Sequence, residues 1–72
     1  MNAESIQQWR ARRPFEPFLI ALSNGETYQV RHPENVIVFK SKLILGFPET
    51  ESTVHVSLIH VNSVKAVQPI DG

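Results

Sequence analysis

The chain has 72 residues, with seven basic and seven acidic side chains and no cysteine. A single domain of this length buries only about 60% of the surface that its unfolded chain exposes, so its stability margin is thin. The absence of cysteine excludes disulfides and thiolate metal sites, so association with a partner is the expected route to added stability. The balanced charge argues against a protein that binds nucleic acid through phosphate contacts.

Residues 2–13 are predicted to form a helix. Asn2 is a suitable N-cap, and Pro14 ends the helix because the ring disfavours helical geometry at the residue before it. Ile6 and Trp9 make a narrow apolar stripe, so we expect the helix to dock on the sheet, with Trp9 covering an open end or face. Cations suit the dipole at the last turn, where three arginines gather: Arg10, Arg12 and Arg13.

A hairpin follows, because residues 18–22 alternate with a period of two and Asn24-Gly25 marks a turn. A two-residue loop would mismatch the apolar faces of the two strands. A three-residue loop over residues 23–25, with a left-handed Gly25, aligns them instead. That register pairs Leu22 with Glu26, Ile20 with Tyr28 and Phe18 with Val30.

The next two strands are predicted at Val36–Phe39 and Leu43–Phe47, after a break at His32-Pro33. Both runs are apolar on consecutive residues, so both faces of these strands need cover. Residues 48–52 read as a polar, exposed loop.

The last part of the chain changes its periodicity. Val54, Val56 and Leu58 alternate, and then Leu58, Val61 and Val64 recur every third residue. This spacing predicts a 3₁₀ turn followed by a last short strand through Val67. Strands are therefore expected within residues 15–67, and residues 68–72 are expected to be a tail of the same single domain.

The predicted fold class is mainly β: an N-terminal helix followed by a five-stranded antiparallel small barrel or curled sheet. The strand, 3₁₀ turn, strand ending resembles that of SH3-like and Sm-like barrels, and the helix-first layout is similar to the Sm-like kind.

A second resemblance lies in the residues themselves. The segment Arg13-Pro14-Phe15-x-Pro17-Phe18, the Asn24-Gly25 turn and His32-Pro33-Glu34 together resemble a set of short, uncharacterised bacterial proteins. These proteins share an R-P-F-x-P-F strand start, a D/N-G turn and an H-P-D/E break. The likeness covers residues 13–34 and implies a bacterial origin and a common small β-fold, but no activity.

Catalytic and metal chemistry find little support in the sequence. His55 and His60 could share a metal with His32, but their spacing matches no compact metal motif, and we interpret all three as surface or interface histidines. Ser57 stands two residues from His55, yet the chain lacks a G-x-S-x-G turn, and Asp71 is its only aspartate. We therefore expect a protein that is not an enzyme and that uses no cofactor.

RNA binding in an Sm-like ring is the alternative implied by the layout. The segments that carry RNA recognition in that family do not match, since Asn62-Ser63 stands where a basic-Gly pair is expected. Candidate nucleic-acid contacts in this alternative are Arg10, Arg12, Arg13, Lys40, Lys42 and His60.

The sequence therefore favours a cytoplasmic, non-enzymatic interaction or structural module that forms a homo-oligomer, with no membrane partner. A third alternative is an accessory subunit of a larger complex. The homo-oligomer is favoured because two strands have apolar side chains on both faces, whereas a thin domain has only one interior. The candidate interface residues are Trp9, Val36, Val38, Phe39, Ile44 and Phe47.

Overall fold

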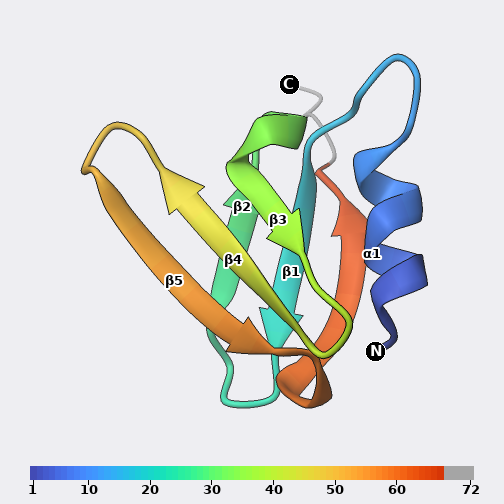
Figure 1. The fold of residues 1–72 in the computed structure, drawn as a ribbon, viewed down its shortest axis with the longest axis vertical. Coiled ribbons are helices and arrows are strands. Elements are labelled where there is room, and N and C mark those ends of the chain that lie inside the picture. The colour runs from blue at the N-terminus through green and yellow to red at the C-terminus, as the bar shows by residue number, and fades with distance from the viewer. Residues whose placement is uncertain (68–72) are drawn as a thin grey trace, which may run out of the picture.

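Two three-stranded antiparallel sheets face each other in the computed structural model, which describes residues 1–67. Their strand orders are β2-β1-β6 and β3-β4-β5 (Figure 1). The elements in chain order are α1 (Ala3–Arg10), β1 (Phe18–Leu22), β2 (Thr27–Val30), the 3₁₀ turn η1 (Pro33–Asn35), β3 (Val36–Val38), β4 (Lys42–Phe47), β5 (Ser52–Ser57), the 3₁₀ turn η2 (Leu58–His60) and β6 (Val61–Ala66).

The prediction of a mainly β chain with an N-terminal helix is confirmed, but the count of five strands is wrong. There are six strands, because the segments before and after η2 each form a full strand. The sheets are not closed into a barrel, since no ladder within residues 1–67 joins one sheet to the other. The chain crosses between the sheets at η1 and η2, and Pro33 in η1 has no N–H to continue a ladder.

The first hairpin has the predicted register. Phe18 pairs with Val30 and Ile20 with Tyr28, and the Leu22 N–H donates to the Glu26 carbonyl at 2.8 Å. Gly25 has a φ of 92°, in the left-handed region that a residue without a side chain adopts most easily. The three-residue loop is therefore confirmed, and it sets which side chains of β1 and β2 face inward.

Helix α1 is shorter than predicted, ending at Arg10 rather than at residue 13. Its N-cap is Asn2, as expected, whose side chain accepts a hydrogen bond from the Ser5 N–H at 2.9 Å. Beyond the helix, the Arg12 guanidinium lies 4.0 Å from the centre of the Trp9 ring. A sequence argument based on Pro14 as the stop signal does not include this stacking.

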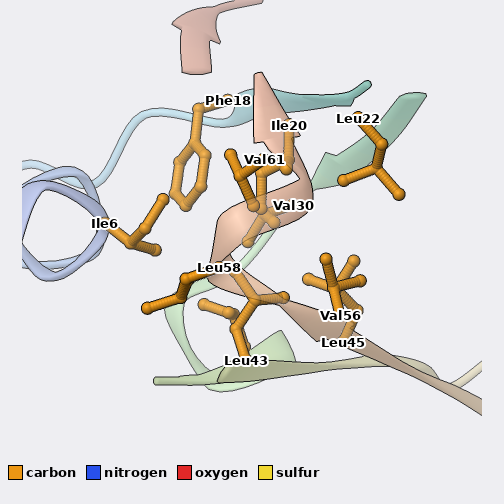
Figure 2. Close-up of a cluster of buried hydrophobic side chains, with 11 residues drawn as sticks. Ile6, Phe18, Ile20, Leu22, Val30, Leu43, Leu45, Val56, Leu58 and Val61 are labelled. Atoms are coloured by element: carbon orange, nitrogen blue, oxygen red, sulfur yellow. The ribbon is translucent and has the colours of Figure 1, made fainter. Parts of the chain in front are cut away.

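The core fills the space between the two sheets. Figure 2 shows side chains from β1 pointing towards side chains from β4 and β5, with Ile6 of α1 entering from one side. The buried residues of β1 and of β4 alternate along their strands, in keeping with the period of two. The buried residues are Ile6, Phe18, Ile20, Leu22, Val30, Val36, Leu43, Leu45, Val56, Leu58 and Val61.

The helix closes one side of this two-layer arrangement. Trp9 contacts Phe18 of β1 with ring centroids 5.7 Å apart, and the Arg10 side chain reaches β3 in the other sheet. Helix α1 thus bridges both layers. Among residues 1–67, no helix has the length and apolar character needed to cross a membrane. The predicted tail lies outside the described residues.

Two isoleucine substitutions test the position of the core. Ile20 is fully buried, so Ile20→Ala should lower the free energy of unfolding by about 2–5 kcal/mol, through lost burial and the cavity left behind. Ile59 is 82% exposed, and Ile59→Ala should change it by no more than about 0.5 kcal/mol. Urea unfolding followed by circular dichroism measures both, and equal losses would contradict the core described here.

Candidate functional site

The sheet formed by β3, β4 and β5 has apolar side chains on the face that points away from the core. Ile37 of β3 and Ile44 of β4 lie directly opposite each other, and Ile44 in turn lies opposite His55 of β5. Their neighbours Val36, Leu43 and Leu45 point inward. We call the side bearing Ile37, Phe39, Ile44 and His55 the outer face.

The outer face is substantially exposed. Ile37 is 55% exposed and Phe39 is 45% exposed, while Ile44 between the two neighbouring strands is half-buried. The Lys42 ammonium lies 5.5 Å from the centre of the Phe39 ring and covers part of it. No element of residues 1–67 packs over these side chains as the second sheet does on the inner face.

The structure separates the six predicted interface residues into three groups. Phe39 and Ile44 belong to the outer face. Val36 is fully buried in the core, so its side chain is not on the surface of the folded chain. The other three are partly buried and pack against the core: Trp9, Val38 and Phe47.

Sequence reasoning missed two exposed apolar side chains, Ile37 and Ile59. Ile37 stands between two valines in an unbroken apolar run, so only the strand register decides which residues face outward. Alternation from the buried Leu43 and Leu45 would have pointed to Ile44 and, across the ladder, to Ile37. Ile59 is in η2, where Leu58 takes the inward position.

A groove lies next to β5, on the side of the molecule away from α1. The groove has a volume of about 530 Å³ and lies between the edge strands β2 and β5. Apolar side chains from three strands line it, together with two histidines. The lining includes Leu22, Tyr28, Val54, His55, Val56 and His60. Unlike the side closed by α1, this side of the two layers is open.

A polar cluster occupies the hairpin turn at one end of this groove. The Glu26 carboxylate accepts hydrogen bonds from the Asn24 amide at 2.7 Å and from the Tyr28 hydroxyl at 3.3 Å. Desolvation raises the pKa of the Tyr28 hydroxyl above its ordinary value, and the charge and hydrogen bond of Glu26 raise it further. The cluster holds the turn in place, and the phenol stays protonated at neutral pH.

The predicted nucleic-acid contacts do not gather on one surface. Arg10, Arg12 and Arg13 lie at the end of α1, whereas Lys40, Lys42 and His60 lie at the other end of the helix, where Met1 and Ser41 both contact Leu58. All three arginines have partners within the chain, and the Arg13 guanidinium donates to the Arg12 carbonyl at 3.5 Å. Arg10 donates to the carbonyls of Pro33 and Val36, and Arg12 stacks on Trp9 and pairs with Glu16 at 3.6 Å.

The histidines are not brought together with other ligands. Within residues 1–67, no group of three or more histidine, cysteine, aspartate or glutamate side chains is placed to hold a metal ion. His55 and Ser57 share the outer side of β5, with His55 opposite Ile44 and Ser57 opposite Lys42. Neither position has a carboxylate directly across the ladder to orient the imidazole.

Comparison with known proteins gives no match: no protein-family model, curated protein or solved structure is similar to this chain. The functional argument therefore depends on the surfaces of the molecule itself.

The contact between α1 and β3 can be tested through Arg10. Its Nε donates to the Pro33 carbonyl at 3.0 Å and to the Val36 carbonyl at 3.2 Å. Arg10→Met should lower the free energy of unfolding by about 1–3 kcal/mol, because two backbone acceptors lose a charged donor. Arg13→Met, at an exposed position, should change it by less than about 0.5 kcal/mol in the same urea experiment. If the two variants lost equal free energy of unfolding, these two Arg10 hydrogen bonds would not stabilise the contact between α1 and β3.

The turn cluster predicts a measurable titration. Glu26→Gln should lower the pKa of Tyr28 towards its ordinary value of 10.0, but not fully, because desolvation remains. Tyrosinate absorbance reports this pKa cleanly, since the chain has one tyrosine. In the unsubstituted protein the folded state keeps the proton longer than the unfolded state, so stability should fall as the pH rises above 10.0. An unchanged pKa in the variant would show that Glu26 has no part in it.

Proposed function

We propose that this chain is a non-enzymatic interaction module that self-associates. One observation carries the proposal: the β3–β4–β5 sheet is covered on its inner face by the core, while its outer face exposes Ile37 and Phe39 beside Ile44. No helix or second sheet of residues 1–67 packs over that face. An apolar sheet surface of this kind is expected to be a contact surface.

The size of the domain strengthens this argument. Residues 1–67 include eleven buried core side chains, and the chain has no cysteine to form a disulfide. Each large apolar group left in water therefore represents burial that the monomer does not gain. Ile37 and Ile44 are also a directly paired cross-strand couple, which gives the exposed groups a common plane. A second copy presents the same surfaces and is therefore the simplest partner.

RNA binding in a ring has less support. Two of its candidate contacts, Arg10 and Arg12, bind groups within the chain, and Lys42 lies over Phe39. The remaining basic groups lie at separate ends of the molecule. A surface that neutralises several neighbouring phosphates needs cations close together.

The proposal predicts a mass above that of the 8.2 kDa monomer in solution. Size-exclusion chromatography with light scattering, over a dilution series around 100 µM, should show a mass that rises with concentration. Raising the salt concentration from about 0.05 to about 0.5 M should not dissociate the assembly, because apolar and backbone contacts are not screened.

Two outcomes would contradict the proposal. A monomeric mass at every concentration would remove self-association. Dissociation by salt alone would show that charges, rather than the sheet described here, hold the copies together.

A further inference from the structure

The two sheets have four edge strands, and three of them carry features that hinder pairing with another strand. β3 has three residues, and Arg10 binds the Val36 carbonyl on its free side. β6 contains Lys65 and a register irregularity where it meets β1. β2 has four residues and is followed directly by Arg31. Charges, short length, bulges and cover are the usual means by which sheet edges avoid pairing.

β5 differs from these three edges within the strand itself, although Glu51 directly precedes it. It is six residues long and contains Ser, Thr, Val, His, Val and Ser, with no charged residue and no proline. Its pairing with β4 is regular over all six positions. Figure 1 places β5 at the outer side of the molecule, away from α1. Within residues 1–67 its second edge pairs with no strand.

The hydrogen-bond pattern identifies which backbone groups of β5 are free. The Leu58 N–H donates to the Ser41 carbonyl, and these two residues continue the β4–β5 register. Hydrogen-bonded pairs alternate along an antiparallel ladder, so Val56 and Val54 also bond to β4. The N–H and C=O groups of Thr53, His55 and Ser57 therefore point outward.

A second hydrogen bond supports this assignment. The Phe39 N–H donates to the Lys42 carbonyl, which directs Lys42 and Ile44 of β4 towards β3. The alternate residues Leu43 and Leu45 then direct their backbone groups to β5, where they lie opposite Val56 and Val54.

We propose that two copies of this chain pair through β5, antiparallel and about a two-fold axis, with His55 opposite His55 of the second copy. This inference rests on the proposed self-association and names a strand edge that would perform it, while the outer face stays exposed in the pair. Among antiparallel registers, this one uses the outward groups of all three residues, since Thr53 then meets Ser57 of the second copy. It joins the two β3–β4–β5 sheets into one sheet of six strands.

Side-chain faces match in the same register. Val54 of one copy lies beside Val56 of the other on the inner face, so the apolar lining of the groove continues across the axis. On the outer face, the row Ile37, Ile44 and His55 continues into the same row of the second copy in reverse order. A register shifted by one residue would place inward side chains beside outward ones.

The charges at the two ends of β5 favour the antiparallel direction. The turn before β5 carries Glu49 and Glu51, and the turn after it carries His60 and no carboxylate. Antiparallel pairing brings the acidic end of one copy to the histidine end of the other. A parallel arrangement would bring the four carboxylates together, which is unfavourable.

Single cysteine substitutions test the register directly, since the natural chain has none. His55→Cys should form a disulfide-linked dimer under mild oxidation, because hydrogen-bonded pairs have Cα atoms about 5.5 Å apart, within disulfide range. Thr53→Cys should link at least about 10-fold more slowly, since the two equivalent positions would be about 13 Å apart. The double variant T53C/S57C should link readily. Gln29→Cys on β2, the other edge of the groove, is the matched control and should behave like Thr53→Cys.

Light scattering on the unsubstituted chain separates this inference from the proposed function. If the natural chain associates but His55→Cys links no faster than Thr53→Cys or Gln29→Cys, the β5 pairing is wrong while self-association stands. If the natural chain is a monomer, both fall. Urea unfolding under reducing conditions verifies that each variant keeps the fold.

A lysine substitution gives a second test. His55→Lys should weaken association at least about 10-fold, because it places like charges opposite each other. An unaltered mass for a folded His55→Lys variant would also overturn the pairing.

Discussion

Burial on one side of each sheet is the constraint on which the rest of this structure depends. The two sheets share one core, and inward positions on the strands fill it with aliphatic side chains and Phe18. Each strand has a second face, and a chain of this length has only one helix among its described residues to cover anything more. That helix packs against one side of the two sheets and does not cover the outer face. The outer face of β3–β4–β5 is therefore left apolar and in water, as a direct result of a sequence that is apolar at consecutive positions.

The position of α1 also makes the molecule asymmetric. On one side Trp9 contacts Phe18 in one sheet, while Arg10 binds the Val36 carbonyl in the other, so the layers are held together and the β3 edge is occupied. On the opposite side β2 and β5 stand apart and form the groove, with contact between the Tyr28 and Phe47 rings at 5.9 Å. Arg10 thus holds the helix against β3 and also occupies a backbone carbonyl on the free edge of β3.

Local rules explain what could be predicted from the sequence. The hairpin register followed from matching apolar faces across Asn24-Gly25, and η2 followed from the period of three at Leu58 and Val61. The division into two sheets did not follow, because it depends on where the chain crosses between layers. The candidate surface was half predicted for a related reason: the run from Val36 to Val38 has no alternation of its own. Its orientation is set by pairing with β4, which assigns Val36 to the core and Ile37 to water.

The arrangement of edges has a consequence for the size of any assembly. An exposed strand edge is a general template, and a chain with two compatible edges could grow into a fibre. Here the candidate edge is self-complementary in backbone groups, in side-chain faces and in end charges, so one pairing event occupies it in both copies. The remaining edges carry Arg10, Lys65 and Arg31 at or beside the strand. In the proposed pairing, association through β5 would occupy this edge in both copies and would not continue from it. The proposed dimer would gain stability by mass action.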